Sequence, residues 1–178
     1  MTWKERRTEY ESEGCMYLAQ IVKEGWTVTP TDDPWTTWDA TISNSTAQYR
    51  CENKVRRYDL NQLDTIYLAK KKLDPAVKYY VEHFPRNSTA LVITYETITK
   101  GLEDGTIETK KIAVPKGQLK YEEGIDSTIE CLENLVIPKY LFEFHSIVGT
   151  ACTVQATPQR SATASSPGRQ PGQRTRQL

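Results

Sequence analysis

The sequence predicts an α/β fold, because helical and strand patterns follow one another along the chain. Apolar residues recur at helical spacing over residues 3–24, whereas apolar and polar residues alternate over 35–57, where two short strands join in a hairpin. Residues 90–95 form a dense apolar run rich in β-branched side chains, which is typical of a strand inside a sheet. Together these patterns indicate a sheet accompanied by helices.

The composition is that of a soluble globular protein. The chain has 178 residues, of which 26% are charged and 38% hydrophobic. No apolar run reaches membrane-spanning length and the charged N-terminus is unlike a signal peptide, so we expect a cytoplasmic protein with no membrane partner. Residues 1–150 are expected to form one domain. Residues 151–178, in which Ser, Thr, Pro, Gln and Arg predominate, are expected to be a disordered basic tail.

Charge is unevenly divided between the domain and the tail. The chain has 23 basic and 23 acidic residues and a formal net charge of zero. Four of the arginines and none of the acids lie in the tail, which leaves the domain with a net charge of −4. An acidic domain disfavours general adhesion to nucleic acid, so any such contact must come from local basic patches.

The cysteines and histidines do not indicate a zinc site. The four cysteines are widely spaced and form no CxxC pair, which favours buried thiols in a reducing compartment. His83 and His145 are isolated from each other and are expected to be structural or surface residues. The sequence also lacks a Gly-rich phosphate loop, a GxSxG elbow and an HExxH motif.

The first helix is expected over residues 3–24, ended by Gly25, with a strand following at 26–30. The apolar stripe of this helix consists of Tyr10, Tyr17, Leu18, Ile21 and Val22. Gly14 lowers the helix propensity of the middle by about 1 kcal/mol. An acidic series with a spacing of four residues comprises Glu5, Glu9 and Glu13. Such a series is usually a solvated helix face.

The hairpin at 35–57 places three chemically active side chains on one face. In its first strand Trp38 faces the core and Asp39 the polar side. In its second strand Glu52 and Lys54 share the polar side because they are two residues apart. If the two strands pair, Asp39, Glu52 and Lys54 gather in one patch.

Two carboxylates and an ammonium at close quarters suit a divalent cation. Mg²⁺ prefers carboxylate and water oxygens at about 2.0–2.1 Å, and such a cation activates water and stabilises charge on phosphorus. The lysine would orient or deprotonate the water, or stabilise the developing negative charge. The alternative is an ordinary solvated face, on which cross-strand ion pairs contribute a few tenths of a kcal/mol. The spacing alone leaves both interpretations open.

A second helix is expected over residues 62–84. Asp74 and Pro75 are expected to break it into two pieces, and the run Lys70–Lys72 lies on its exposed part. The strand at 90–95 is then expected in the middle of the sheet.

The remainder of the domain is less clearly patterned. Residues 101–111 are expected to form a charged hairpin turn, and a third helix is expected over 127–135. The segment 137–148 is ambiguous between helix and strand.

The order helix, strand, hairpin with Asp…Glu-x-Lys, helix and hydrophobic strand resembles the PD-(D/E)xK nuclease superfamily, over about residues 3–98. The resemblance implies a restriction-endonuclease-like αβββαβ core with a mixed central sheet flanked by helices, with residues 99–150 as an elaboration. It implies that Asp39 and Glu52 hold the metal and that Lys54 completes the catalytic site. Many members add a glutamate of the first helix, for which Glu13 is the first choice and Glu9 the second.

The resemblance also implies what such a site would do. It implies Mg²⁺- or Mn²⁺-dependent hydrolysis of phosphodiester bonds by an endonuclease, with DNA favoured over RNA as the substrate. The family is typical of phages, mobile elements, restriction and repair, and many members cut as dimers, so a homodimer is compatible with it. A basic rim around the acids would bind the nucleic acid through Arg56, Arg57, Lys70 and Lys71, with Lys72 beside them.

Two other interpretations remain open. The chain could be a non-catalytic nucleic-acid-binding or protein-interaction module on the same scaffold, with its carboxylates in ordinary cross-strand pairs. The negative charge of the domain favours this alternative modestly. An unrelated small α/β enzyme is the third interpretation, but the sequence offers no nucleophile–base pair for it.

Overall fold

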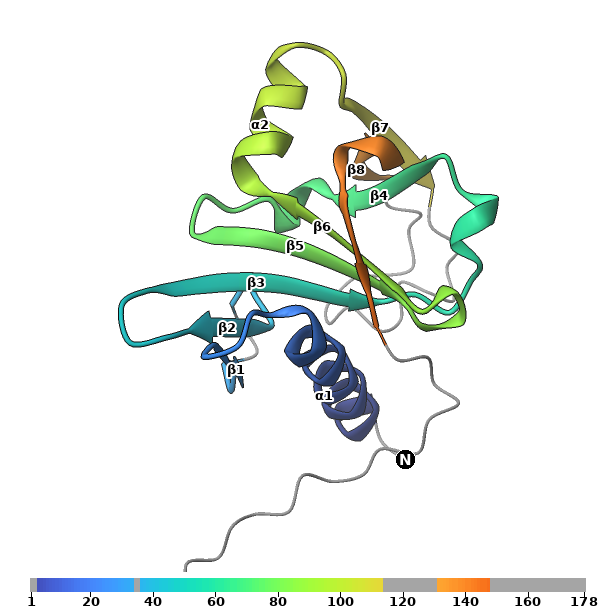
Figure 1. The fold of residues 1–178 in the computed structure, drawn as a ribbon. Coiled ribbons are helices and arrows are strands. Elements are labelled where there is room, and N and C mark those ends of the chain that lie inside the picture. The colour runs from blue at the N-terminus through green and yellow to red at the C-terminus, as the bar shows by residue number, and fades with distance from the viewer. Residues whose placement is uncertain (1–2, 34–35, 114–130, 148–178) are drawn as a thin grey trace, which may run out of the picture.

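The computed structural model describes residues 3–33, 36–113 and 131–147. They form an α/β structure of one mixed six-stranded sheet, one three-stranded sheet and two α-helices (Figure 1). The α/β class expected from the sequence is therefore confirmed. No helix in these residues is long and apolar enough to cross a membrane.

The six-stranded sheet has the strand order β1-β2-β3-β5-β6-β9. Its strands are β1 (Thr27–Pro30), β2 (Ala40–Ser43), β3 (Gln48–Val55), β5 (Val77–Phe84), β6 (Thr89–Thr94) and β9 (Glu143–Ser146). All neighbours are antiparallel except β3 and β5, which are parallel. A parallel pair needs a crossover connection, and here the crossover contains a strand of the other sheet.

The three-stranded sheet is antiparallel, with the order β4-β8-β7. Its strands are β4 (Thr65–Ala69), β7 (Glu108–Ala113) and β8 (Cys131–Pro138). The short 3₁₀ turn η2 (Lys70–Lys72) follows β4 directly and leads back towards β5. The connection from β3 to β5 therefore passes through the small sheet before it returns to the large one.

Two hydrophobic cores lie on opposite sides of the large sheet. Helix α1 (Trp3–Ile21) covers one side, where Tyr17 and Leu18 pack against Cys51 and Val81. The small sheet and helix α2 (Tyr95–Glu103) cover the other side (Figure 1). That second core is formed by residues from both sheets, among them Leu68, Tyr80, Phe84, Leu91, Leu135 and Ile137.

The first half of the chain agrees with the sequence-based expectation. The first helix, the strand after it and the hairpin are all present, as α1, β1 and the β2–β3 pair. The hydrophobic strand expected at 90–95 is β6, and it lies between β5 and β9 inside the sheet, as expected.

The expectation of a second helix over residues 62–84 is wrong. The segment instead contains β4, η2 and β5, so the αβββαβ order does not hold at this point in the described chain. The reason is burial on both faces: every residue from Tyr80 to Phe84 is buried. A strand that is covered on both faces carries no alternation of apolar and polar residues, and its pattern can be mistaken for that of a helix.

The later expectations are corrected in a similar way. The third helix expected over 127–135 is wrong for residues 131–135, which belong to β8, while 127–130 lie outside the described residues. The turn expected at 101–111 is shorter, because α2 continues to Glu103 and β7 begins at Glu108. The segment 137–148 contains the end of β8, a 3₁₀ turn and strand β9. The tail at 151–178 lies outside the described residues.

Candidate functional site

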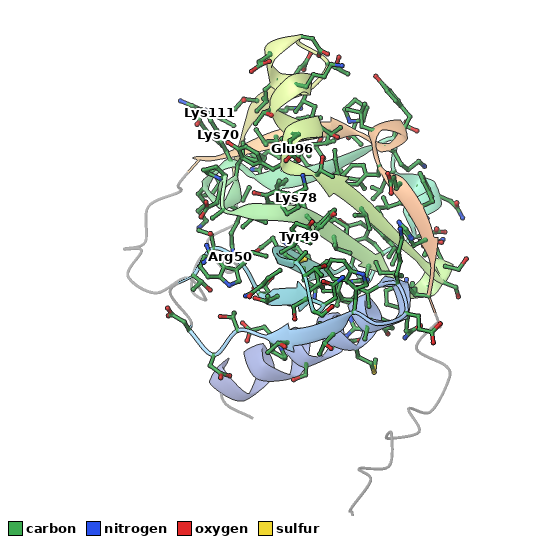
Figure 2. All side chains as sticks on the ribbon, turned by 60° about the vertical axis from the view of Figure 1, so that its left-hand side comes forward. Tyr49, Arg50, Lys70, Lys78, Glu96 and Lys111 are labelled. Carbon is green, nitrogen blue, oxygen red and sulfur yellow. The ribbon has the colours of Figure 1, made fainter. Side chains whose placement is uncertain are left out.

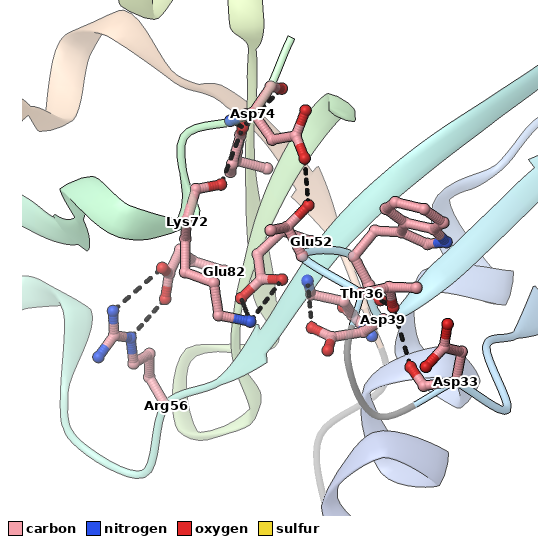
Figure 3. A network of polar contacts seen from close by, with 12 residues as sticks. Asp33, Thr36, Asp39, Glu52, Arg56, Lys72, Asp74 and Glu82 are labelled. Atoms are coloured by element: carbon pink, nitrogen blue, oxygen red, sulfur yellow. Dashed lines mark hydrogen bonds and ion pairs between the residues drawn. The ribbon is translucent and has the colours of Figure 1, made fainter. Parts of the chain in front are cut away.

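The hairpin brings Asp39 and Glu52 face to face. Ala40 of β2 pairs with Cys51 of β3, and the Asp39 N–H donates to the Cys51 carbonyl at 2.9 Å, which extends the pairing by one residue. The Asp39 carboxylate also accepts a hydrogen bond of 2.9 Å from the N–H of Asn53 (Figure 3). The strand backbone therefore fixes the Asp39 side chain beside that of Glu52.

Glu52 is a buried acid in contact with a second acid. Its side chain is only 11% exposed, and the two carboxyl groups interact directly. Burial, followed by the charge of Asp39, raises the pKa of Glu52 to about 8, and the neighbouring ammonium of Lys72 offsets part of this rise. Two acids in this relationship are costly to keep ionised together unless a cation lies between or beside them.

Lys72 supplies one positive charge to this acid pair. Its Nζ lies 3.1 Å from Oε1 and 3.2 Å from Oε2 of Glu52 (Figure 3). The turn that carries Lys72 is held by Tyr80, whose hydroxyl donates to the Lys72 carbonyl at 3.2 Å and accepts from the Asp74 N–H at 2.9 Å. The sequence indicated only a run of three lysines, and the helix expected there gave no reason to single out Lys72.

Lys54 lies one strand repeat beyond Glu52 on the same face. It pairs in register with Glu82 of the parallel strand β5, and its side chain is exposed. Loss of hydration and then the charge of Arg56 lower the pKa of Lys54, while the charges of Glu82 and Glu52 oppose this shift. Within the described part of the chain no hydrogen bond or ion pair holds its ammonium, which is therefore available to a ligand.

Arg56 has a different environment from the one expected for a nucleic-acid contact. Its Nε and Nη2 pair with the buried carboxylate of Glu82, and Nη2 also donates to the Tyr67 carbonyl at 3.0 Å. Its side chain is only 13% exposed. This bidentate pair joins the large sheet to β4 of the small one, and a phosphate contact by Arg56 stays a prediction.

Glu13 is not brought into a three-acid cluster with Asp39 and Glu52. Its Oε1 accepts from the Tyr17 hydroxyl at 3.2 Å, and its Oε2 pairs with Arg57, which was expected to bind nucleic acid. Among the residues that the structure describes, no three His, Cys, Asp or Glu side chains gather closely enough to hold a metal ion. The structure thus joins two of the three expected ligands, and a role for Glu13 stays a prediction.

The other expected basic residues lie on the turn that carries Lys72. The Nζ of Lys70 is 3.1 Å from Oε2 of Glu133 in β8, and both side chains are about half exposed. Lys71 is also exposed. Both lysines lie on the same short turn as Lys72. A nucleic-acid contact by either of them stays a prediction.

Asn53 connects this site to α1. Its Oδ1 contacts Nε2 of the fully buried His83, whose pKa burial lowers to about 3. Gly14 of α1 lies against the Asn53 amide so closely that a Cβ there would be 2.4 Å from its Nδ2. Asn53, whose backbone N–H binds the Asp39 carboxylate, therefore packs against α1.

Comparison with known proteins gives one structural likeness. No family model and no curated protein matches the sequence. Among solved structures, the chain is similar to D212, a nuclease from a fusselovirus, with a TM-score of 0.40 and 10% sequence identity. The likeness covers 74% of this chain and 77% of that one.

Proposed function

We propose that this protein is a metal-dependent nuclease that hydrolyses phosphodiester bonds in nucleic acid, with DNA as the favoured substrate. The observation that supports the proposal is the placement of the Asp39 carboxylate close enough to Glu52 for its charge to act on that carboxyl group, with Lys54 two residues further along β3. Burial and then the charge of Asp39 raise the pKa of Glu52, so it costs free energy to keep both acids ionised in the isolated protein. A divalent cation would turn the repulsion into an attraction.

The chemistry of these donors fits Mg²⁺ or Mn²⁺. Mg²⁺ is usually held by one or two carboxylates, while waters and substrate phosphates complete its coordination. Asp39 and Glu52 would supply the two carboxylates, and Glu13 would have to leave Arg57 to add a third. When bound, the cation would generate a nucleophilic water and stabilise the charge on the phosphate.

Groups of the protein itself would orient the ligands, the attacking water and the phosphate. The N–H of Asn53 keeps the Asp39 carboxylate oriented. The lowered pKa of Lys54 increases the fraction of neutral amine at a given pH, and its Nζ would orient the attacking water or take its proton. The Lys72 ammonium neutralises Glu52 before any cation arrives and can then donate to a phosphate oxygen.

The proposal is tested by metal binding and cleavage with the full chain. Titration calorimetry with Mn²⁺ should give a binding heat that Asp39→Asn and Glu52→Gln abolish. Cleavage of DNA in Mg²⁺ should be lost in both variants and in Lys54→Met. Glu143→Gln is the control, because its carboxylate on β9 is 82% exposed. Wild-type cleavage by all three variants would show that the site is assigned wrongly.

A non-catalytic module on the same scaffold is the second candidate. It is favoured by the existing ion pairs, since Glu52 already has Lys72 and Glu82 already has Arg56 as partners. Such a module would show no Mn²⁺ heat that depends on Asp39. The homodimer that the family resemblance allows is a separate proposal, which sedimentation of the full chain would test.

A further inference from the structure

A polar hollow lies at the beginning of strands β3 and β5. It has a volume of about 370 Å³, and it is lined by Gln48, Tyr49, Arg50, Ala76 and Lys78. Figure 2 shows the side of the molecule on which it lies, with Arg50, Tyr49, Lys78 and Glu96 labelled close to one another. The hollow contains two cationic side chains, an amide and a phenol, and it contains no acid.

The strand register explains how the two cations come together. Arg50 is two residues before Glu52 on β3, so it lies on the same face, about 6.6 Å away along the strand. Arg50 pairs with Val77 of β5 but Cys51 pairs with Tyr79, which leaves Lys78 without a partner in the ladder. Such bulges redirect a side chain, and they are frequent beside active sites.

Arg50 is held in place by an aromatic ring. Its guanidinium carbon lies 4.0 Å from the centre of the Trp38 ring, and Trp38 directly precedes Asp39. The stack fixes the plane of the guanidinium. The Arg50 side chain makes no hydrogen bond or ion pair with any residue that the structure describes. Its donors are therefore oriented and still available.

Lys78 has one partner, and that partner is exchangeable. Its Nζ lies 2.5 Å from Oε1 of Glu96, the second residue of α2, whose side chain is 62% exposed. A solvated pair of this kind contributes little to stability. A more strongly charged anion in the hollow could therefore replace Glu96 as the partner of Lys78.

We propose that the hollow formed by Arg50 and Lys78 binds a backbone phosphate of the nucleic acid, next to the phosphate at the acid pair. The planar fork of an arginine matches phosphate oxygens in a bidentate manner, and a lysine adds a point charge. The position one strand repeat from Glu52 would align the chain of the substrate along β3. This inference rests on the proposed function and assigns it a substrate-positioning subsite.

The test is fluorescence anisotropy of a short labelled DNA duplex with the full-length protein in EDTA, where no cleavage takes place. Arg50→Gln and Lys78→Gln should each raise the dissociation constant roughly tenfold and lower the salt dependence by about one phosphate contact. Arg50→Lys should restore part of the affinity. Glu96→Gln should lower the dissociation constant, because it releases Lys78.

Arg86→Gln is the matched control. Arg86 is exposed in the turn after β5, at the opposite end of that strand from Lys78, and its removal takes away the same charge. If Arg50→Gln and Arg86→Gln weaken binding equally, only net charge matters and the subsite is wrong. Failure of the wild-type protein to bind the duplex would also overturn the subsite. The proposed function is judged separately by the Mn²⁺ heat, which needs no nucleic acid.

Discussion

Gly14 of α1 lies directly against the side-chain amide of Asn53 in β3, at a distance where a Cβ would come within 2.4 Å of Nδ2. The same Asn53 donates its backbone N–H to the Asp39 carboxylate at 2.9 Å. A glycine in the middle of a helix reduces helix propensity, and no pattern in the sequence explains its presence. The structure does: the absent side chain lets α1 approach the strand that carries the candidate site.

Gly14→Ala is therefore expected to destabilise the protein. Helix propensity alone would stabilise the variant by about 1 kcal/mol, whereas overpacking against a buried amide costs about 1–3 kcal/mol. Urea unfolding measures which effect dominates, and the control Ser12→Ala changes an exposed position of the same helix. A more stable Gly14→Ala protein would mean that Asn53 moves aside freely.

His83 should make the protein sensitive to acid. Burial lowers its pKa from 6.5 to about 3, so the unfolded chain takes up a proton at a higher pH than the folded one. The contribution of His83 to the free energy of unfolding should then fall as the pH decreases below about 6.5, by about 1.4 kcal/mol per pH unit at most, until the pH approaches 3, while the raised pKa of Glu52 acts in the opposite direction. Urea unfolding at neutral and mildly acidic pH measures this dependence.

Two histidine variants isolate that contribution. His83→Gln should remove the histidine's part of the acid dependence, although it also changes stability at neutral pH. His145→Gln, at a half-buried ring of the edge strand β9, should leave the acid dependence in place. An unchanged slope in His83→Gln would show that other groups cause the acid sensitivity.

The Arg56–Glu82 pair should contribute far more to stability than the Lys70–Glu133 pair. The first is almost fully buried and bidentate, and the second is about half exposed on both sides. Glu82→Gln leaves a buried arginine without its counter-charge, which costs about 3–5 kcal/mol. Glu133→Gln should cost less than about 1 kcal/mol. Denaturant unfolding compares the stability of the two variants. Similar losses of unfolding free energy would mean that burial does not set the contribution of these pairs.

The hairpin residues could be predicted from the sequence because their geometry is local. Glu52 and Lys54 lie on one strand and Asp39 lies at the entry to its hairpin partner, so alternation predicts that the three share one face. The structure has the antiparallel hairpin, with Glu52 and Lys54 two residues apart on β3 and Asp39 directly before β2. Their roles in metal binding and catalysis stay predictions.

The partners of these residues could not be predicted. Lys72 lies in η2 and Glu82 lies in β5, both within a segment where the sequence pattern predicted a helix. Strand β5 is buried on both faces and pairs in parallel with β3, so neither its pattern nor its distance along the chain revealed the pairing. The pairing of Arg56 with Glu82 could not be predicted for the same reason, because Glu82 was expected on a helix.

Lys72 occupies the position from which a cation would neutralise Glu52, so its removal should strengthen metal binding. In the wild type a divalent cation must compete with an ammonium that lies 3.1 and 3.2 Å from the two Glu52 oxygens. In Lys72→Met the acid pair keeps its repulsion and loses that counter-charge. Because Lys72 offsets part of the rise of the Glu52 pKa to about 8, its removal should raise that pKa further and make the variant less stable than the wild type above about pH 8 in the absence of metal.

Thermal unfolding with increasing Mg²⁺ measures this competition. A ligand that binds only the folded state raises Tm according to its concentration relative to Kd, so the rise should be larger for Lys72→Met than for the wild type. Adding Asp39→Asn should cancel it. Lys70→Met is the matched control on the same turn, because its ammonium pairs with Glu133 instead. If Mg²⁺ raises Tm equally in the wild type, Lys72→Met and Lys70→Met, Lys72 does not compete with the cation for Glu52.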